Sequence, residues 1–126
     1  MRNTVQKNVV YETVTSSCDH PDVETVYYRA KKILPSISIA TVYRVLTNLT
    51  KQGKIYKVAC PTGDRYDKTL IKHAHFKCKV CNSVTDIMSV DVINALSLAH
   101  TESENKIDEA DFLFSGTCKN CLNLVN

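Results

Sequence analysis

The sequence predicts an α+β fold in two parts: three helices and a β-hairpin, then an α/β half that a metal ion closes. Two observations predict it. Apolar residues recur at helical spacing through three segments of the first half and then alternate as in a strand. In the second half, two Cys-x-x-Cys motifs are separated by 36 residues, which is room for a strand, a helix and a return strand. We place the two domains at residues 1–69 and residues 70–126.

The first two helices are predicted from apolar spacing and from their end signals. Valines recur near the helical period in the first helix, at Val5, Val9, Val10 and Val14. Asp19, just before His20-Pro21, is expected to cap the second helix, and Pro35 is expected to stop it. The predicted inner face of the second helix consists of Val23, Val26, Tyr27, Ala30, Ile33 and Leu34.

A third helix and a hairpin complete the first part. Ser38 is expected to cap this helix and Gly53 to end it. The residues expected to face inward are Ile39, Val42, Leu46 and Leu49. Residues 54–58 alternate like a strand, residues 61–64 form a turn, and residues 65–67 return. Three helices followed by a two-stranded wing are the order of a winged helix-turn-helix.

The outward face of the third helix predicts a DNA-binding surface. Residues 1–58 carry 9 Lys and Arg against 4 Asp and Glu, a net charge of +5, whereas residues 59–126 carry 7 against 9, a net charge of −2. A basic first half favours a polyanionic partner. The outward residues are cationic or hydrogen-bonding, as contacts to phosphates and base edges require. The residues predicted to contact DNA are Ser38, Thr41, Tyr43, Arg44, Thr47, Asn48 and Lys51. A merely solvated face is the alternative, and the wing favours DNA.

The two Cys-x-x-Cys motifs predict a structural zinc site. Cys78, Cys81, Cys118 and Cys121 offer four sulfurs, which suits tetrahedral Zn²⁺. Disulfides are the main alternative, but the residues after Met1 are polar and give no secretory signal, so we expect a cytoplasmic protein with reduced thiols. Iron held by four thiolates is a rarer alternative. The remaining cysteines, Cys18 and Cys60, have no partner at ligand spacing.

A second metal site is predicted beside the first zinc knuckle. His73 and His75 alternate on a predicted strand, so their side chains share one face. Asp86 is expected on the paired strand, Asp67 lies at the boundary between the two domains, and His20 belongs to the first. Imidazoles combined with carboxylates suit Fe²⁺, Mn²⁺ or Zn²⁺. Each residue taken singly is more often a surface or capping residue, but the His-x-His pair beside a zinc knuckle favours a site.

The chain resembles the ferric-uptake regulator (Fur) family along essentially its whole length. The segment from Ser38 to Leu46 resembles the family's recognition helix. The other matching segments are Arg2-Asn3-Thr4-Val5-Gln6-Lys7, His20-Pro21, Gly63-Asp64-Arg65-Tyr66-Asp67 and His73-Ala74-His75-Phe76-Lys77-Cys78. The resemblance implies a homodimeric, metal-dependent repressor with a C-terminal α/β dimerisation domain. Such a dimer binds double-stranded operator DNA with an inverted repeat.

Within the family, the resemblance is closest to the peroxide-responsive, PerR-type branch. The five regulatory ligands of that branch fall on His20, Asp67, His73, His75 and Asp86, whereas the iron-responsive branch typically has Glu at the position of Asp86. The resemblance implies that Fe²⁺ or Mn²⁺ at this site closes the dimer for DNA binding. It also implies that hydrogen peroxide inactivates the repressor through iron-catalysed oxidation of His20 or His73. The alternative is a regulator of iron or other divalent-metal uptake without peroxide sensing.

Two other classes of protein are weighed against a repressor. A metalloenzyme would use His73, His75 and Asp86 around a catalytic metal, but the chain contains no nucleophile motif, phosphate-binding glycine loop or HExxH. We therefore do not expect an enzyme. A zinc-stapled protein-interaction module would have no metal switch and would not respond to added Fe²⁺ or Mn²⁺. The sequence holds no transmembrane run, so no membrane partner is expected.

Overall fold

A computed structural model describes residues 2–125, and side chains are described for residues 4–123. It divides into two compact units, Met1–Leu70 and Ile71–Asn126. Met1 and Asn126, the outer ends of the two predicted domains, lie outside the described residues. The side chains of Arg2 and Asn3, in the first-helix motif, are likewise outside the described set.

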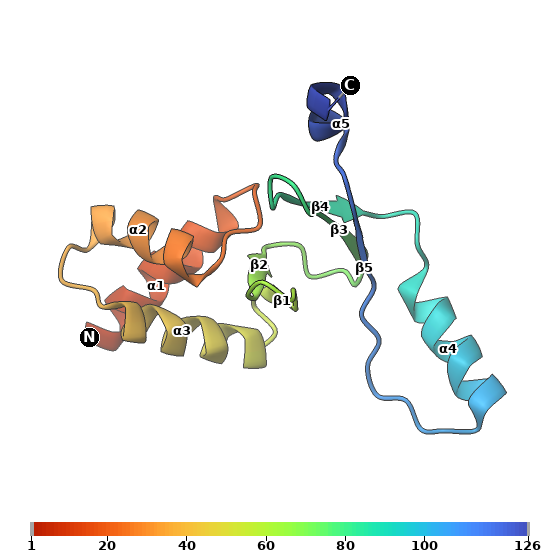
Figure 1. Ribbon diagram of the computed structural model, residues 1–126. Coiled ribbons are helices and arrows are strands. Elements are labelled where there is room, and N and C mark those ends of the chain that lie inside the picture. Colours follow the sequence, from red (N-terminus) through yellow and green to blue (C-terminus); the bar gives the residue numbers. More distant parts are fainter. Residues whose placement is uncertain (1, 126) are drawn as a thin grey trace. The chain divides into compact units, whose positions relative to one another are not determined.

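The first unit has the predicted order of helices and strands (Figure 1). Its helices are α1 (Arg2–Thr15), α2 (Val23–Ile33) and α3 (Ile39–Lys51). They are followed by β1 (Tyr56–Val58) and β2 (Arg65–Asp67), which pair antiparallel with Tyr56 opposite Asp67. Gly53 follows the end of α3 with a φ of 71°, the left-handed conformation that ends many helices and suits glycine. This order confirms the winged-helix prediction for the first unit.

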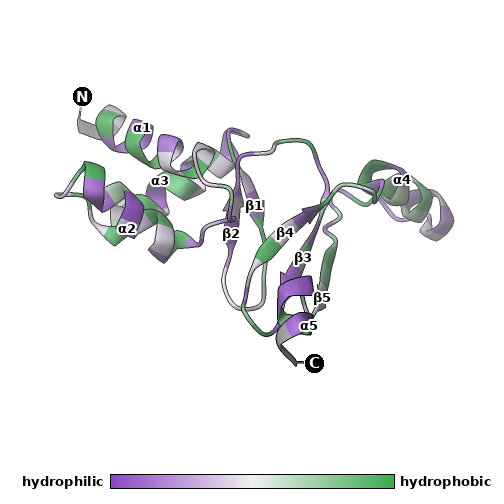
Figure 2. Cartoon of the chain, turned by 90° about the horizontal axis from the view of Figure 1, so that it is seen from above, coloured by the Kyte–Doolittle hydropathy of each residue, from purple (hydrophilic) through white to green (hydrophobic). Residues whose placement is uncertain are grey.

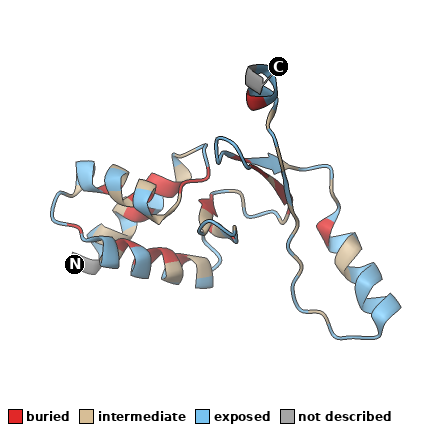
Figure 3. Cartoon of the chain, in the orientation of Figure 1, coloured by how far each residue is buried: buried red, intermediate tan, exposed pale blue. Residues whose placement is uncertain are grey.

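The core of the first unit lies where the three helices meet, as the buried stretches of Figure 3 show. Its fully buried members include Val10, Val14, Val26, Ala30, Val42, Leu46 and Leu49. Three predicted core residues are wrong: Val5 is 50% exposed, Ile33 is 61% exposed and Ile39 is 45% exposed. All three lie in the first or last turns of their helices, where the neighbouring helices do not cover them. Val45, which the predicted stripe left out, is only 6% exposed.

The cap of α2 differs from the predicted one. Asp22, and not Asp19, is the N-cap residue, and its Oδ1 accepts a hydrogen bond of 2.9 Å from the Thr25 N–H. Asp19 instead forms a two-pronged ion pair with Arg29, at 2.9 and 2.6 Å. The spacing of apolar residues places a helix start only to within a turn, and two aspartates stood within that turn.

We expect Asp22→Ala to lower the free energy of unfolding of the first unit by about 1 kcal/mol, the usual cost of losing an N-cap. Partial burial alone would raise the pKa of Asp22, but hydrogen bonds from Thr25 and the charge of Arg65 outweigh it and lower that pKa below 3.8. The stabilisation is therefore present above pH 3.8 and is lost as the pH falls through the lowered native pKa. Urea unfolding at pH 7 and near pH 3 measures both effects. Equal destabilisation by Asp19→Ala, whose ion pair is exposed, would argue against the cap.

The second unit is built on a three-stranded sheet with β3 in the centre. β3 (Ala74–Cys78) pairs antiparallel with β4 (Val84–Ile87) and parallel with β5 (Leu113–Gly116). α4 (Val92–Ser103) connects β4 to β5, and α5 (Lys119–Val125) follows β5. The predicted strand, helix and return strand between the two Cys-x-x-Cys motifs are therefore confirmed as β4, α4 and β5.

The helix α4 is covered by little of its own chain. Figure 3 shows it exposed along most of its length, and Val92 is its one buried residue among those described. Ile93 is 70% exposed and Leu98 is 62% exposed, and Figure 2 shows apolar residues along the helix. Apolar side chains left open in this way are typical of a surface that a partner covers. Within the described residues, none of the helices has both the length and the apolar character needed to span a membrane.

Candidate metal centres and nucleic-acid interface

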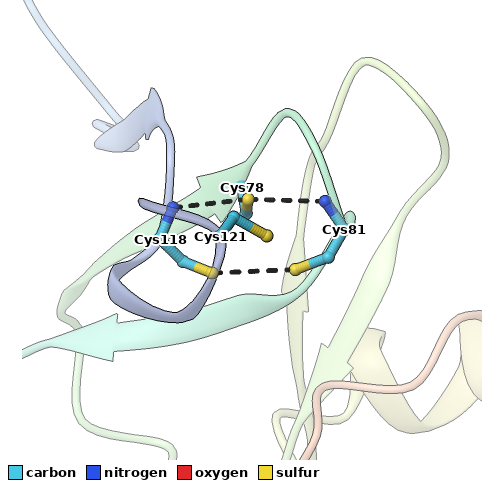
Figure 4. A group of neighbouring side chains, drawn as sticks. All are labelled: Cys78, Cys81, Cys118 and Cys121. Carbon is cyan, nitrogen blue, oxygen red and sulfur yellow. Dashed lines mark hydrogen bonds between the residues drawn. The ribbon is translucent and has the colours of Figure 1, made fainter. Parts of the chain in front are cut away.

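The four cysteines of the two Cys-x-x-Cys motifs converge in the second unit (Figure 4). Cys78 ends β3 and Cys81 lies in the following turn. Cys118 directly precedes α5, and Cys121 lies in the first turn of that helix. Their sulfurs all lie within 4.8 Å of one another, and those of Cys81 and Cys118 are 3.8 Å apart. Sulfurs held about 2.3 Å from a tetrahedral Zn²⁺ lie about 3.8 Å apart, so the donor set and spacing fit zinc.

Hydrogen bonds from backbone N–H groups stabilise negative charge on the Cys78 sulfur of this cluster. The N–H groups of Cys81 and Cys118 each lie 3.4 Å from the Cys78 sulfur, and these hydrogen bonds lower the pKa of Cys78 to about 6. The contact of Cys81 with the Ser83 hydroxyl, at 3.1 Å, lowers the pKa of Cys81. By contrast, the neighbouring Cys118 thiol raises the pKa of Cys121 to about 12. Negative charge gathered on close sulfurs is what a divalent metal relieves.

In the first unit, the wing holds His20 and Asp67 together. His20 Nε2 lies 3.2 Å from Asp67 Oδ2, and both side chains are 6% exposed. Two contacts from β2 fix the loop that carries His20: Arg65 donates to the His20 carbonyl at 3.1 Å, and the Tyr66 N–H donates to the Pro21 carbonyl at 3.0 Å. His20 has a φ of 51°, which is uncommon for a residue other than glycine and occurs often at functional sites.

In the second unit, His73, His75 and Asp86 come together on one face of the β3–β4 pair. His75 lies directly opposite Asp86 in the strand register. Asp86 Oδ1 is 2.8 Å from His73 Nε2 and 3.3 Å from His75 Nε2, and the two imidazole rings are 4.3 Å apart between centroids. Ligand atoms at right angles and about 2.1 Å from a metal ion lie about 3 Å apart, so these separations fit a bound divalent metal.

The backbone also sets the orientation of the His73 ring. His73 Nδ1 contacts the Ile71 carbonyl, which can only accept a hydrogen bond, so Nδ1 carries a proton. In the neutral ring, Nε2 then presents its lone pair toward the carboxylate of Asp86. Two lone pairs at 2.8 Å require a proton or a metal cation between them. Holding one imidazole nitrogen on a carbonyl is the usual way in which proteins orient a metal-binding histidine.

The predicted DNA-binding residues lie on the outer side of α3. Arg44, Asn48 and Lys51 are exposed, and Tyr43 is 59% exposed. Two hydroxyls are engaged within the helix: Ser38 Oγ accepts from the Thr41 N–H at 3.1 Å as the N-cap, and Thr47 donates to the Tyr43 carbonyl at 2.9 Å. Thr41 and Thr47 are half-buried. The side chains of Tyr43, Arg44, Asn48 and Lys51 are therefore more accessible on this surface than those of Thr41 and Thr47.

Sequence reasoning missed the residues that orient the candidate ligands. Arg65 and Pro21 fix the His20 loop, and the Ile71 carbonyl orients His73. None of these contacts follows a periodicity or a ligand-spacing rule. Pro21 and Arg65 both lie in segments that resemble the family's motifs, but that resemblance did not indicate an orienting role for either residue. The structure also places Lys68 Nζ 3.5 Å from the sulfur of Cys18.

A winged helix joined to a unit rich in metal-ligand side chains defines a metal-responsive, DNA-binding transcription regulator. The sequence model of the ferric uptake regulator family matches residues 1–114, and the chain belongs to this family. Its members are transcription regulators.

Individual relatives include a transcriptional regulator named FurA and a peroxide-responsive repressor. The transcriptional regulator FurA of Mycobacterium tuberculosis is 31% identical over 127 residues, which cover 96% of this chain and 83% of FurA. The peroxide-responsive repressor PerR of Staphylococcus saprophyticus is 25% identical, over 96% of this chain and 82% of PerR. Among solved structures, the Campylobacter jejuni peroxide stress regulator superimposes with a TM-score of 0.80 at 25% identity, over 95% of this chain and 91% of that one.

Proposed function

We propose that this protein is a metal-dependent repressor that binds operator DNA as a homodimer and is inactivated by hydrogen peroxide through oxidation of its histidine ligands. The observation that carries the proposal is the cluster of His73, His75 and Asp86, with one carboxylate oxygen 2.8 and 3.3 Å from the two imidazole nitrogens. The similarity to peroxide-responsive regulators supports the same reading.

The regulatory site would draw on both units. We propose that His20 and Asp67, paired in the first unit, join His73, His75 and Asp86 of the second around Fe²⁺ or Mn²⁺. Three imidazoles and two carboxylates suit either metal. If the metal binds one arrangement of the units better than others, it shifts the population toward that arrangement, which we take to be the DNA-binding one. The zinc site of Cys78, Cys81, Cys118 and Cys121 would serve only as a structural staple.

Peroxide sensing would depend on the chemistry of the metal and on damage to its ligands. Bound Fe²⁺ would supply electrons to reduce hydrogen peroxide beside the imidazoles, whereas Mn²⁺ would occupy the same ligands and react poorly. His20 and His73 are the residues proposed to be oxidised. An oxygen added to either ring would remove a ligand. Arg65 and β2 hold the loop of His20, and the Ile71 carbonyl holds the ring of His73. Loss of the ligand would release the repressor from DNA.

Dimerisation is supported by the apolar surface of the second unit. Met88, Ile93, Leu98 and Phe114 are each at least 45% exposed. Covering them with a second copy would bury apolar area and leave two copies of α3 related by a two-fold axis. A dimer with two-fold symmetry binds a DNA site that has the same symmetry, so the proposed operator is an inverted repeat.

The proposal predicts a metal-specific oxidation. After a brief pulse of hydrogen peroxide, Fe²⁺-loaded protein prepared without oxygen should gain one oxygen on the peptide containing His20 or His73 and lose DNA binding. The Mn²⁺-loaded protein should remain unmodified and bound, since it does not reduce peroxide readily. Peptide mass spectrometry and fluorescence anisotropy with duplex DNA measure the two effects.

The second candidate function is a metal-uptake regulator without peroxide sensing. The similarity to the ferric uptake regulation protein 2 of Mycolicibacterium fortuitum, at 28% identity over 96% of this chain, favours it. Unmodified histidines in the Fe²⁺ protein, together with DNA binding that simply follows added metal, would establish this alternative. Duplex binding that is insensitive to any divalent metal would reject both candidates.

A further inference from the structure

The groove between α1 and the outer side of α3 contains two adjoining hollows, which share one lining residue. The smaller, of about 200 Å³, is lined by Lys7, Arg44, Val45, Asn48 and Gln52. Arg44, Asn48 and Gln52 follow one another at intervals of four residues, so they form one stripe running along α3 and into its C-cap. Lys7 comes from α1 and lines the same hollow.

The larger hollow continues from the same lysine. It encloses about 370 Å³ and is lined by Lys7, Asn8, Tyr11, Leu49, Gly53, Lys54 and Leu70. Lys7 is thus shared by both hollows. Taken together, the linings supply three cations and three side-chain amides, and neither contains a carboxylate among the described residues.

The cations of this groove are not neutralised by the protein. Among residues 4–123, neither Lys7 nor Arg44 forms a salt bridge with a carboxylate. Other cations of the same unit do: Arg29 is bound to Asp19 at 2.6 Å, and Lys57 lies 3.9 Å from Asp64. Uncompensated cations that converge with amide donors are suited to an anion with several oxygens.

We propose that the groove holds a backbone phosphate of the operator, with Lys7 of α1 and Arg44 of α3 binding it from opposite sides. Arg44 and Asn48 also belong to the predicted DNA-contacting face of α3, so a phosphate here would lie beside the bases that the rest of this face reads. Phosphate contacts fix register and orientation without reading sequence. This inference rests on the proposed DNA binding and adds to it a positioning residue from α1.

The test compares three single substitutions in the full-length, Mn²⁺-loaded protein. Lys7→Gln keeps much of the side-chain length and removes the charge, Lys7→Arg keeps the charge, and Lys106→Ala removes one charge from the second unit, where Lys106 is 86% exposed. Anisotropy gives the dissociation constant over a series of salt concentrations. The probes are a duplex that the wild-type protein selects from a random pool and a scrambled version of it. Circular dichroism checks that each variant is folded.

Lys7→Gln is expected to weaken binding to both duplexes by the same factor. It should also flatten the plot of log affinity against log salt by about 2 for a dimer, since each lost phosphate contact accounts for about 0.9. Lys7→Arg should retain the wild-type slope. The phosphate contact would be wrong if the salt-dependence slope of Lys7→Gln equalled that of Lys106→Ala while the wild-type protein still bound the selected duplex. That result would leave the proposed DNA binding itself standing. Loss of binding to the selected duplex only would show instead that Lys7 reads bases. Wild-type protein that selects no duplex would overturn the proposed function as well.

Discussion

Replacing Cys118 by serine is expected to unfold the second unit and to abolish its zinc. The sulfur of Cys118 lies 3.8 Å from that of Cys81 and is one of the four sulfurs within 4.8 Å of one another, so the substitution removes one proposed zinc ligand. Structural Zn²⁺ contributes about 10–16 kcal/mol of apparent binding free energy at pH 7 in zinc-finger peptides. A whole domain is stabilised by only about 5–15 kcal/mol. Loss of the proposed zinc would therefore be large enough to unfold the second unit.

Three measurements detect the loss of zinc and the unfolding of the second unit in Cys118→Ser. Metal analysis should find little zinc, gel filtration should show loss of the dimer, and limited proteolysis should leave a fragment ending near Leu70. That fragment should survive because the first unit has its own core of helix side chains. Cys60→Ser, which alters a cysteine outside the cluster, is the matched control and should behave as wild type. A normal dimer of Cys118→Ser with full zinc content would contradict the structural role of the cluster.

Asp86→Ala is expected to abolish metal-activated DNA binding and to leave the dimer folded. One oxygen of Asp86 contacts both His73 and His75, so the substitution removes a proposed metal ligand that also contacts the two imidazoles. Mutating partners that only support metal ligands costs about 10–100-fold in metal affinity, so losing a ligand should weaken Mn²⁺ binding by about 100-fold or more. The Asp86 side chain is 33% exposed, so truncating it leaves no large cavity.

Calorimetric titration with Mn²⁺ and anisotropy with duplex DNA measure this loss. Asp108→Ala is the control, because its carboxylate is 78% exposed and pairs only with exposed Lys106 in the described structure. Zinc content and gel-filtration volume should be unchanged in both variants. Should Asp86→Ala still bind DNA on addition of Mn²⁺, the regulatory site must lie elsewhere.

Much of the fold could be predicted because its signals are local. Helical spacing located α1, α2 and α3. Alternation located a strand within residues 54–58, where β1 lies, and the turn that follows placed β2 at residues 65–67. Asp86 was predicted on the strand that pairs with the strand of His75, and the structure sets these two residues directly opposite each other. Ligand spacing alone brought the four cysteines together as candidates, and the structure places their sulfurs within 4.8 Å.

What could not be predicted depends on contacts between segments far apart in the chain. The choice of Asp22 over Asp19 as a cap depends on where Arg29 and Arg65 lie. The exposure of Ile33 and Ile39 depends on how far the neighbouring helices extend. The groove that Lys7 shares with Arg44 forms only when α1 packs on α3. Helical periodicity reports which face of a helix is buried, but not which neighbour covers it or where that cover ends.

The strand β3 separates the imidazole of His75 from the sulfur of Cys78, which belong to the two candidate metal sites. His75 and Cys78 are three residues apart, about 10 Å along a strand, and alternation turns their side chains to opposite faces. Thiolates are themselves readily oxidised. The proposed oxidation of a histidine ligand would therefore take place on the face of β3 opposite to the Cys78 sulfur. A subunit oxidised at a histidine would then remain folded while losing its regulatory metal.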